Sequence, residues 1–131
     1  MKLFLDDVRQ PKDCTQYMYQ RIGPLTPIYL HEWMVVRNYD EFVNAVTNNY
    51  NEITHISFDH DLSDEHYDPA MYQGETEYNE LYNQFTEKTG YECAKWLKEF
   101  YQENNKQLPV MFVHSMNPTG TQNIINVFKN A

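Results

Sequence analysis

Three short apolar runs of this chain end abruptly in acidic or imidazole side chains, and this pattern constrains the fold more than any other feature. The run Ile53–Phe58 meets Asp59, His60 and Asp61, the run Leu3–Leu5 meets Asp6 and Asp7, and the run Val110–Val113 meets His114 and Ser115. Runs of this length predict buried strands. If the strands are parallel, their carboxyl ends share one edge of the sheet, so we expect these polar groups to converge there.

The remaining segments predict one further strand and three helices. Trp33–Val36 has a strand-like apolar run, and Asp40–Val46 has the spacing of a short amphipathic helix. A second helix should begin at Thr89, where Thr89 and Glu92 have the spacing of a capping box, and fray by Asn104. After a turn at residues 116–120, a terminal helix at residues 121–129 should bury four side chains: Ile124, Ile125, Val127 and Phe128. This order predicts an α/β sandwich with a mainly parallel sheet of about four strands.

Two segments show neither the alternation of a strand nor the spacing of an amphipathic helix. Residues 12–30 contain Gly23, Pro24 and Pro27, which predicts a loop with one short helical turn around Gln16–Arg21. Residues 63–88 are rich in acidic and tyrosine side chains and predict an acidic insertion that is mobile or partly helical around residues 77–85.

Length and composition predict one soluble domain spanning residues 1–131. The hydrophobic fraction is 41%, and no stretch approaches the roughly 18 apolar residues of a membrane span. Asp6, Asp7 and Arg9 interrupt any apolar leader at the N-terminus. Cys14 and Cys93 form no disulfide framework, so we expect a reducing, cytoplasmic setting.

The net charge of −9 argues against binding to duplex DNA or to extended RNA, since such binding needs a basic face. A small phosphorylated ligand stays compatible with this charge, because a divalent cation held by aspartates reverses the sign of the local field.

The aspartates of the first two strand ends are candidate metal ligands. Hard divalent ions such as Mg²⁺ or Mn²⁺ prefer oxygen ligands. An isolated aspartate pair more often caps a turn, but acidic pairs behind two neighbouring strands favour the metal interpretation. The candidate set is Asp6, Asp7, Asp59 and Asp61.

His60 and His114 are candidates for proton transfer. Imidazoles exchange protons near neutral pH, so two of them beside a phosphodiester can serve as general base and general acid. Each is equally a candidate metal ligand, and each taken alone is more simply a hydrogen-bonded histidine at a strand end.

Arg9, Ser115 and Asn117 are candidates for binding phosphate. The arginine fork suits phosphate oxygens, while Ser115 and Asn117 can donate from another strand end. The alternative for Arg9 is an ion pair with a nearby aspartate.

Four spaced motifs together resemble the cyclic-phosphate-processing receiver-like family: Leu3–Pro11 (LFLDDVRQP), Ile56–Leu62 (ISFDHDL), Thr89–Glu92 (TGYE) and Val113–Gly120 (VHSMNPTG). The resemblance implies a receiver-like, flavodoxin-like fold in which Asp6, Asp7 and Asp59 occupy the acidic pocket. It also implies action on cyclic phosphate ends or cyclic nucleotides.

The chain departs from ordinary phosphorelay receivers in one informative way. Such receivers use a lysine after a late strand to hold the aspartyl phosphate, whereas only Lys129 follows Val113 here. The extra His60, Asp61 and His114 therefore favour hydrolysis or ligand capture over phosphotransfer. The insertion at residues 63–88 is either a lid, a partner-binding surface or a disordered loop.

The leading hypothesis is a metal-assisted phosphoesterase acting on a cyclic phosphate of a nucleotide or RNA end. Asp59, His60 and His114 would be catalytic, and the aspartates would hold Mg²⁺ or Mn²⁺. The alternatives are a module that sequesters a nucleotide without turnover and a degenerate receiver that acts as a protein-interaction domain.

Overall fold

A four-stranded parallel sheet forms the centre of the computed structural model, which describes residues 1–62 and 88–129. The strands are β1 (Lys2–Leu5), β2 (Met34–Val36), β3 (His55–Phe58) and β4 (Val110–Val113), in the order β2-β1-β3-β4. All three pairings are parallel, and the last residues of the strands lie in register, with Phe58 beside both Leu5 and Val113. The predicted parallel sheet is confirmed, and the polar residues behind the strands share one edge.

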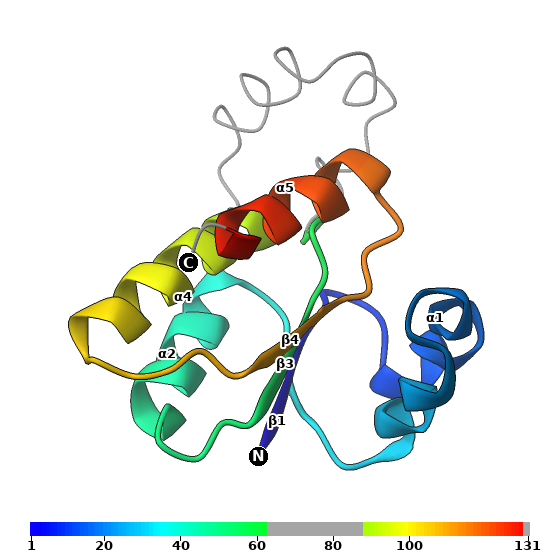
Figure 1. Cartoon of the computed structure of the whole chain (residues 1–131), viewed down its shortest axis with the longest axis horizontal. Coiled ribbons are helices and arrows are strands. Elements are labelled where there is room, and N and C mark those ends of the chain that lie inside the picture. Colours follow the sequence, from blue (N-terminus) through cyan, green and yellow to red (C-terminus); the bar gives the residue numbers. More distant parts are fainter. Residues whose placement is uncertain (63–87, 130–131) are drawn as a thin grey trace.

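Helices cover both faces of the sheet (Figure 1). One face carries α2 (Tyr39–Asn49), α4 (Gly90–Glu103) and α5 (Pro118–Lys129). The other carries α1 (Thr15–Ile22), which lies between two 3₁₀ helices, η1 (Pro11–Cys14) and η2 (Gly23–Leu30). The result is a three-layer α/β sandwich.

The alternation of side chains along each strand separates two hydrophobic cores. Leu5 and Phe58 belong to the larger core beneath α2, α4 and α5. Phe4 points the other way and packs with Met18 and Tyr29 in the smaller core beneath α1. Strands β1, β2 and β4 therefore contribute hydrophobic side chains to both cores, so the sheet is packed on both faces.

The helical turn predicted around Gln16–Arg21 is confirmed as part of α1, but the prediction of a loop for the rest of residues 12–30 is wrong, because this segment is mostly helical. Proline in the first turn of η1 and of η2 is compatible with a helix start, where the missing N–H has no intrahelical partner. Gly23, with φ of 53°, ends α1 in the left-handed region. The segment is stabilised by burying Cys14, Met18 and Tyr29 against the sheet, a tertiary effect that local periodicity does not reveal.

Three smaller predictions also differ from the structure. Helix α5 begins at Pro118, three residues earlier than predicted, since the Asn117 side chain accepts the N–H of Gly120 and caps the first turn. Thr89 is the N-cap of α4, but its side chain makes no capping hydrogen bond, so the capping box is absent. Ile125 is 43% exposed rather than buried.

The predicted acidic insertion at residues 63–88 lies outside the described residues except for Lys88.

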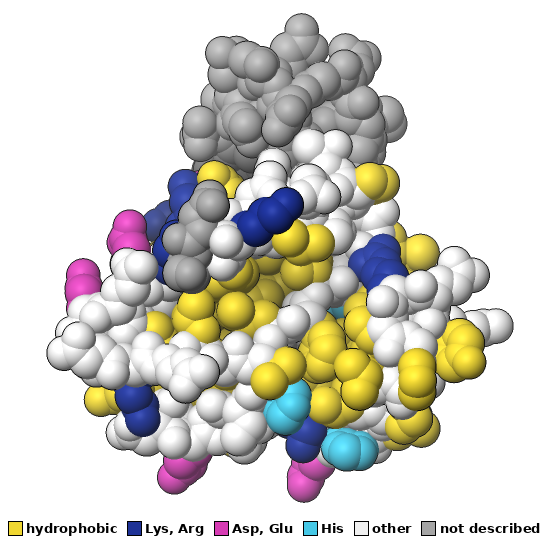
Figure 2. All heavy atoms as spheres, viewed as in Figure 1, with side chains coloured by type: hydrophobic (Ala, Val, Ile, Leu, Met, Phe, Trp, Pro, Cys, Tyr) yellow, Lys and Arg dark blue, Asp and Glu magenta, His cyan; other side chains and the backbone are white. Residues whose placement is uncertain are grey.

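Strand β4 is one of the two edge strands of the sheet, and hydrophobic side chains gather on both sides of it (Figure 2). Val110 is 53% exposed there.

Among residues 1–62 and 88–129, no helix has the length and apolar character needed to cross a membrane.

Gly90 sets the distance between α4 and the end of β3, and its substitution tests this packing. A Cβ atom at this position would lie 1.8 Å from the carbonyl oxygen of Asp59, which is a backbone atom held by the sheet. We expect Gly90→Ala to lower the free energy of unfolding by about 2–4 kcal/mol, measured by urea denaturation. Glu99→Ala, at an exposed position of the same helix, should change it by less than about 0.5 kcal/mol. Equal stability of the two variants would contradict the close approach.

Candidate metal and phosphate site

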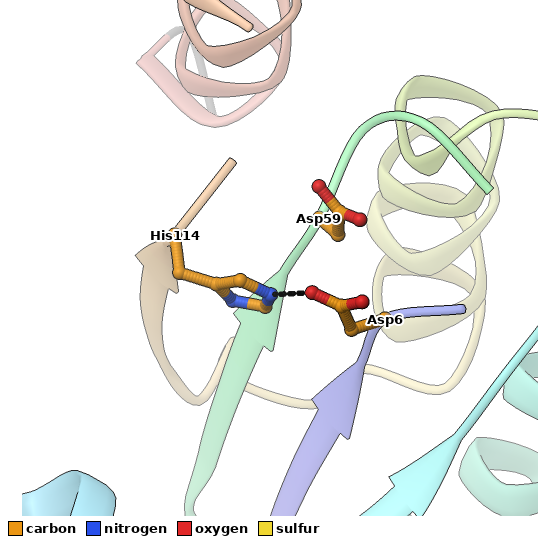
Figure 3. A group of neighbouring side chains, drawn as sticks. All are labelled: Asp6, Asp59 and His114. Atoms are coloured by element: carbon orange, nitrogen blue, oxygen red, sulfur yellow. Dashed lines mark hydrogen bonds and ion pairs between the residues drawn. The ribbon is translucent and has the colours of Figure 1, made fainter. Parts of the chain in front are cut away.

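Asp6, Asp59 and His114 come together at the carboxyl edge of the sheet, each directly behind a different strand (Figure 3). One ligand atom of each lies within 4.8 Å of the others, and all three residues are buried. The register of the strands explains why these residues are neighbours. The last residues of β1, β3 and β4 are paired, so the residues that directly follow them lie side by side.

Asp6 organises the turn that follows β1. Its Oδ1 atom accepts the backbone N–H groups of Val8 at 2.9 Å and Arg9 at 2.8 Å, and its Oδ2 atom lies 3.0 Å from Nε2 of His114. Burial alone would raise the pKa of Asp6, but the hydrogen bonds from His114 and the two backbone amides hold that pKa below its usual value. Asp6 is therefore a carboxylate in the folded protein.

One carboxylate oxygen of Asp59 has no partner among the described residues. The Oδ1 atom of Asp59 accepts the backbone N–H of His60 at 2.9 Å, whereas the buried Oδ2 atom forms no hydrogen bond with residues 1–62 or 88–129. Burial, together with the negative charge of Asp6, raises the pKa of Asp59 to about 8. An unsatisfied oxygen beside a second carboxylate fits a hard divalent cation, which would supply the missing positive charge.

The imidazole of His114 is held on every side. Its Nε2 atom faces Asp6, its Nδ1 atom lies 2.6 Å from Oγ of Ser57, and that hydroxyl lies 2.7 Å from the hydroxyl of Tyr29. The ring stacks on Phe4, with centroids 4.3 Å apart. Burial lowers the pKa of His114 despite the hydrogen bond to Asp6, so the ring is neutral at neutral pH.

Arg9 lies beside the two carboxylates with its side chain 22% exposed. Its Nη1 atom is 3.4 Å from Oδ2 of Asp6 and 4.0 Å from Oδ1 of Asp59. The guanidinium of Arg37 fixes the same turn from β2 by donating to the backbone oxygens of Asp6 and Arg9 at 3.0 and 2.8 Å. Arg9 is thus a partly exposed cation beside a buried acidic pair.

His60 and Asp61 lie outside this cluster. Nδ1 of His60 is 2.9 Å from Oδ1 of Asp61, and the Asp61 carboxylate accepts the amide of Asn117 at 3.3 Å. A Cβ atom on Gly120 would lie 2.3 Å from the His60 ring, so α5 packs directly on the imidazole. His60, Asp61 and Asn117 therefore link the end of β3 to the start of α5.

The other predicted site residues have local roles at the same edge. Ser115 is buried, and its Oγ atom accepts the backbone N–H of Asn117 at 3.1 Å. Asp7 is half-buried behind Asp6 and is not one of the three clustered groups in the described part of the chain. Of the four predicted metal ligands, the structure thus brings Asp6 and Asp59 together and adds His114 to them.

Sequence reasoning missed Ser57, Tyr29 and Arg37. Ser57 is a polar residue within the apolar run of β3, and this could have marked it as a candidate site residue. Its side chain lies on the face of the sheet opposite to Ile56 and Phe58. Tyr29 lies in the segment wrongly predicted as a loop, and nothing in its local sequence points to His114.

The sheet order, the helices on both faces and the acidic pair at the carboxyl edge define a receiver-like α/β domain. The chain belongs to the family described as the cyclic-phosphate processing receiver domain, whose model matches residues 1–130. Neither a search of curated proteins nor a search of solved structures finds a match. The family predicted from the four motifs is confirmed, together with its fold.

The raised pKa of Asp59 predicts how stability depends on pH in metal-free protein. Asp59 binds a proton more tightly when folded, with a pKa of about 8 against 3.8, so this contribution to stability is present below pH 4 and is lost as pH rises through 8. Between pH 5 and 8.5, the free energy of unfolding should fall by at least about 2 kcal/mol less in Asp59→Asn than in the wild-type protein, because asparagine does not titrate. Urea denaturation at several pH values in EDTA measures it, and parallel pH profiles for the two proteins would contradict the crowding of Asp59.

Proposed function

We propose that this protein is a phosphoesterase that uses Mg²⁺ or Mn²⁺ to hydrolyse a cyclic phosphate of a nucleotide or RNA end. The observation that carries the proposal is the buried group of Asp6, Asp59 and His114, in which one carboxylate oxygen of Asp59 has no partner in the described part of the chain. Membership of a family concerned with cyclic phosphates supports the choice of substrate. The buried thiol of Cys14, which forms no disulfide, is in keeping with a reducing cytoplasm.

Asp6 and Asp59 would hold the cation through their carboxylates, and His114 would complete the set through Nε2. A bound divalent cation polarises the phosphoryl oxygen and lowers the pKa of water beside it. Without metal, the ring hydrogen of the neutral His114 lies on Nε2 and is donated to Asp6. For Nε2 to hold a cation, this hydrogen would have to lie on Nδ1 instead, where the Ser57 hydroxyl can accept it because a hydroxyl both donates and accepts. Ser57 is thus a positioning residue for the proposed ligand set.

Hydrolysis adds one water across a ring ester bond. The water oxygen bonds to phosphorus, one ester oxygen leaves, and the proton released by the water ends on that oxygen. Arg9 is the group that we assign to the phosphate, since its fork lies beside both carboxylates and is partly exposed. Ser115 and Asn117 would support the phosphate from the end of β4 through the turn that they form.

We assign His60 and Asp61 to positioning rather than to proton transfer or metal binding. The His60 ring is buried between Asp61 and Gly120 and takes no part in the cluster of Asp6, Asp59 and His114. Its contacts hold α5 against the end of β3, which fixes where Asp59 lies.

The activity is tested with purified protein and a panel of nucleoside 2′,3′-cyclic phosphates, cyclic mononucleotides and cyclic dinucleotides, in Mg²⁺, Mn²⁺ or EDTA. We expect cleavage only with metal. Asp59→Asn should lower kcat/KM by at least about 100-fold, because it replaces an anionic ligand by a neutral one. Asp40→Asn, an exposed aspartate in the first turn of α2, is the matched control and should retain activity.

The outcomes separate the three functional hypotheses. Tight binding of a cyclic nucleotide with no product would replace the enzyme by a sequestering module. An absence of both binding and turnover would leave a receiver-like interaction domain. Cleavage that persists in EDTA at the same rate would exclude the metal-assisted mechanism.

The role of Ser57 gives an independent prediction about metal affinity. Ser57→Ala removes the hydroxyl that would orient His114, so the dissociation constant for Mn²⁺ should rise about tenfold in isothermal titration calorimetry. Thr26→Ala is the control, because it removes another buried hydroxyl whose partner is the Gly23 carbonyl, away from the site. Equal Mn²⁺ affinity in both variants would show that Ser57 does not orient a metal ligand.

A further inference from the structure

All three arginines of this acidic chain lie at the carboxyl edge of the sheet. Arg9 follows β1, Arg37 follows β2, and Arg21 reaches from α1 to the end of β4, where its Nη1 atom donates to the carbonyl oxygen of Val113 at 3.0 Å. The net charge is −9, so this concentration of guanidinium groups opposes the general sign of the chain. Guanidinium groups suit phosphate better than ammonium groups do, because their donors form a planar fork.

Arg21 differs from the other two in having charge and donors to spare. Arg9 forms ion pairs with Asp6 and Asp59, and Arg37 donates to two backbone oxygens of the same turn. Arg21 is exposed and forms no ion pair with a carboxylate in the described part of the chain. Its one hydrogen bond there, to Val113, leaves most of its five N–H groups for another acceptor.

The position of Arg21 is fixed by the same residue that contacts Arg9. The guanidinium carbons of Arg21 and Arg9 lie 5.7 and 5.8 Å from the ring centroid of Tyr17. The Tyr17 hydroxyl donates to the backbone oxygen of His114 at 2.7 Å, which ties this ring to the cluster. Arg21 is therefore a pre-ordered cation one aromatic ring away from the guanidinium that we assign to the cyclic phosphate.

Resting on the function proposed above, we propose that Arg21 binds a second phosphate group of the substrate. A cyclic phosphate carries one negative charge, and the cation with Arg9 already meets it. A further fixed guanidinium beside them calls for a further anion. The substrate class is then a nucleotide that carries a phosphate besides the cyclic one, either a 5′-phosphate or the phosphodiester of a longer chain.

The test compares a nucleoside 2′,3′-cyclic phosphate with two ligands: the same nucleotide carrying a 5′-phosphate, and a dinucleotide ending in the same cyclic phosphate. For the wild-type protein with Mn²⁺, the extra phosphate should lower KM about tenfold. Arg21→Ala should abolish that difference and leave KM for the simple cyclic phosphate unchanged, and Arg21→Lys should restore part of it. The ligand of the two that gains the tenfold identifies the source of the second phosphate.

The controls separate binding from a structural role of Arg21. Lys106→Ala removes an exposed cation from the loop that precedes β4 and should change none of the KM values. If Arg21 only anchors α1 to β4, Arg21→Ala will lower thermal stability and weaken all three ligands equally, which overturns the proposal. Turnover of the simple cyclic phosphate without any gain from a second phosphate overturns this inference alone, whereas no turnover of any ligand overturns the proposed function with it.

Discussion

Burial of two acidic side chains side by side is the constraint on which the rest of this structure depends. Asp6 and Asp59 lie behind neighbouring strands, where little water screens the repulsion between two charged carboxylates, and the pKa of Asp59 is therefore raised to about 8. The compensating donors come from separate parts of the chain: the turn at Arg9, the end of β4 at His114, and the backbone of His60. Because these donors must all be in place at once, the unfavourable free energy of burying the two acids is offset by the tertiary fold and not by any single element.

The helices of the larger core are adapted to the same edge. Gly90 and Gly120 allow the first turns of α4 and α5 to approach the backbone of Asp59 and the ring of His60 more closely than any side chain would permit. The helix N-termini thereby carry their partial positive charge toward the end of β3. Packing and electrostatics therefore favour the same arrangement of these two helix ends.

The sequence permitted prediction of the sheet and the acidic edge, but not of the layer beneath α1. Apolar runs that end in Asp or His can be recognised from the local sequence. The pattern alone therefore predicts β1, β3 and β4 and the proximity of Asp6 to Asp59. Residues 12–30 fold by burying Met18 and Tyr29 against Phe4, a contact that no local periodicity encodes. The pairing of His60 with Asp61, and of His114 with Ser57, depends equally on tertiary contacts, so two histidines of similar appearance in the sequence occupy different environments.

The stacking of His114 on Phe4 has a consequence for the order of events at this edge. The aromatic ring closes one face of the imidazole, and neither Asp6 nor His114 has any surface open to water. If Arg9 binds the phosphate, as proposed above, it would exchange its contacts with Asp6 and Asp59 for contacts with that phosphate. Binding of the anion and exposure of the two acids would then depend on the same side chain.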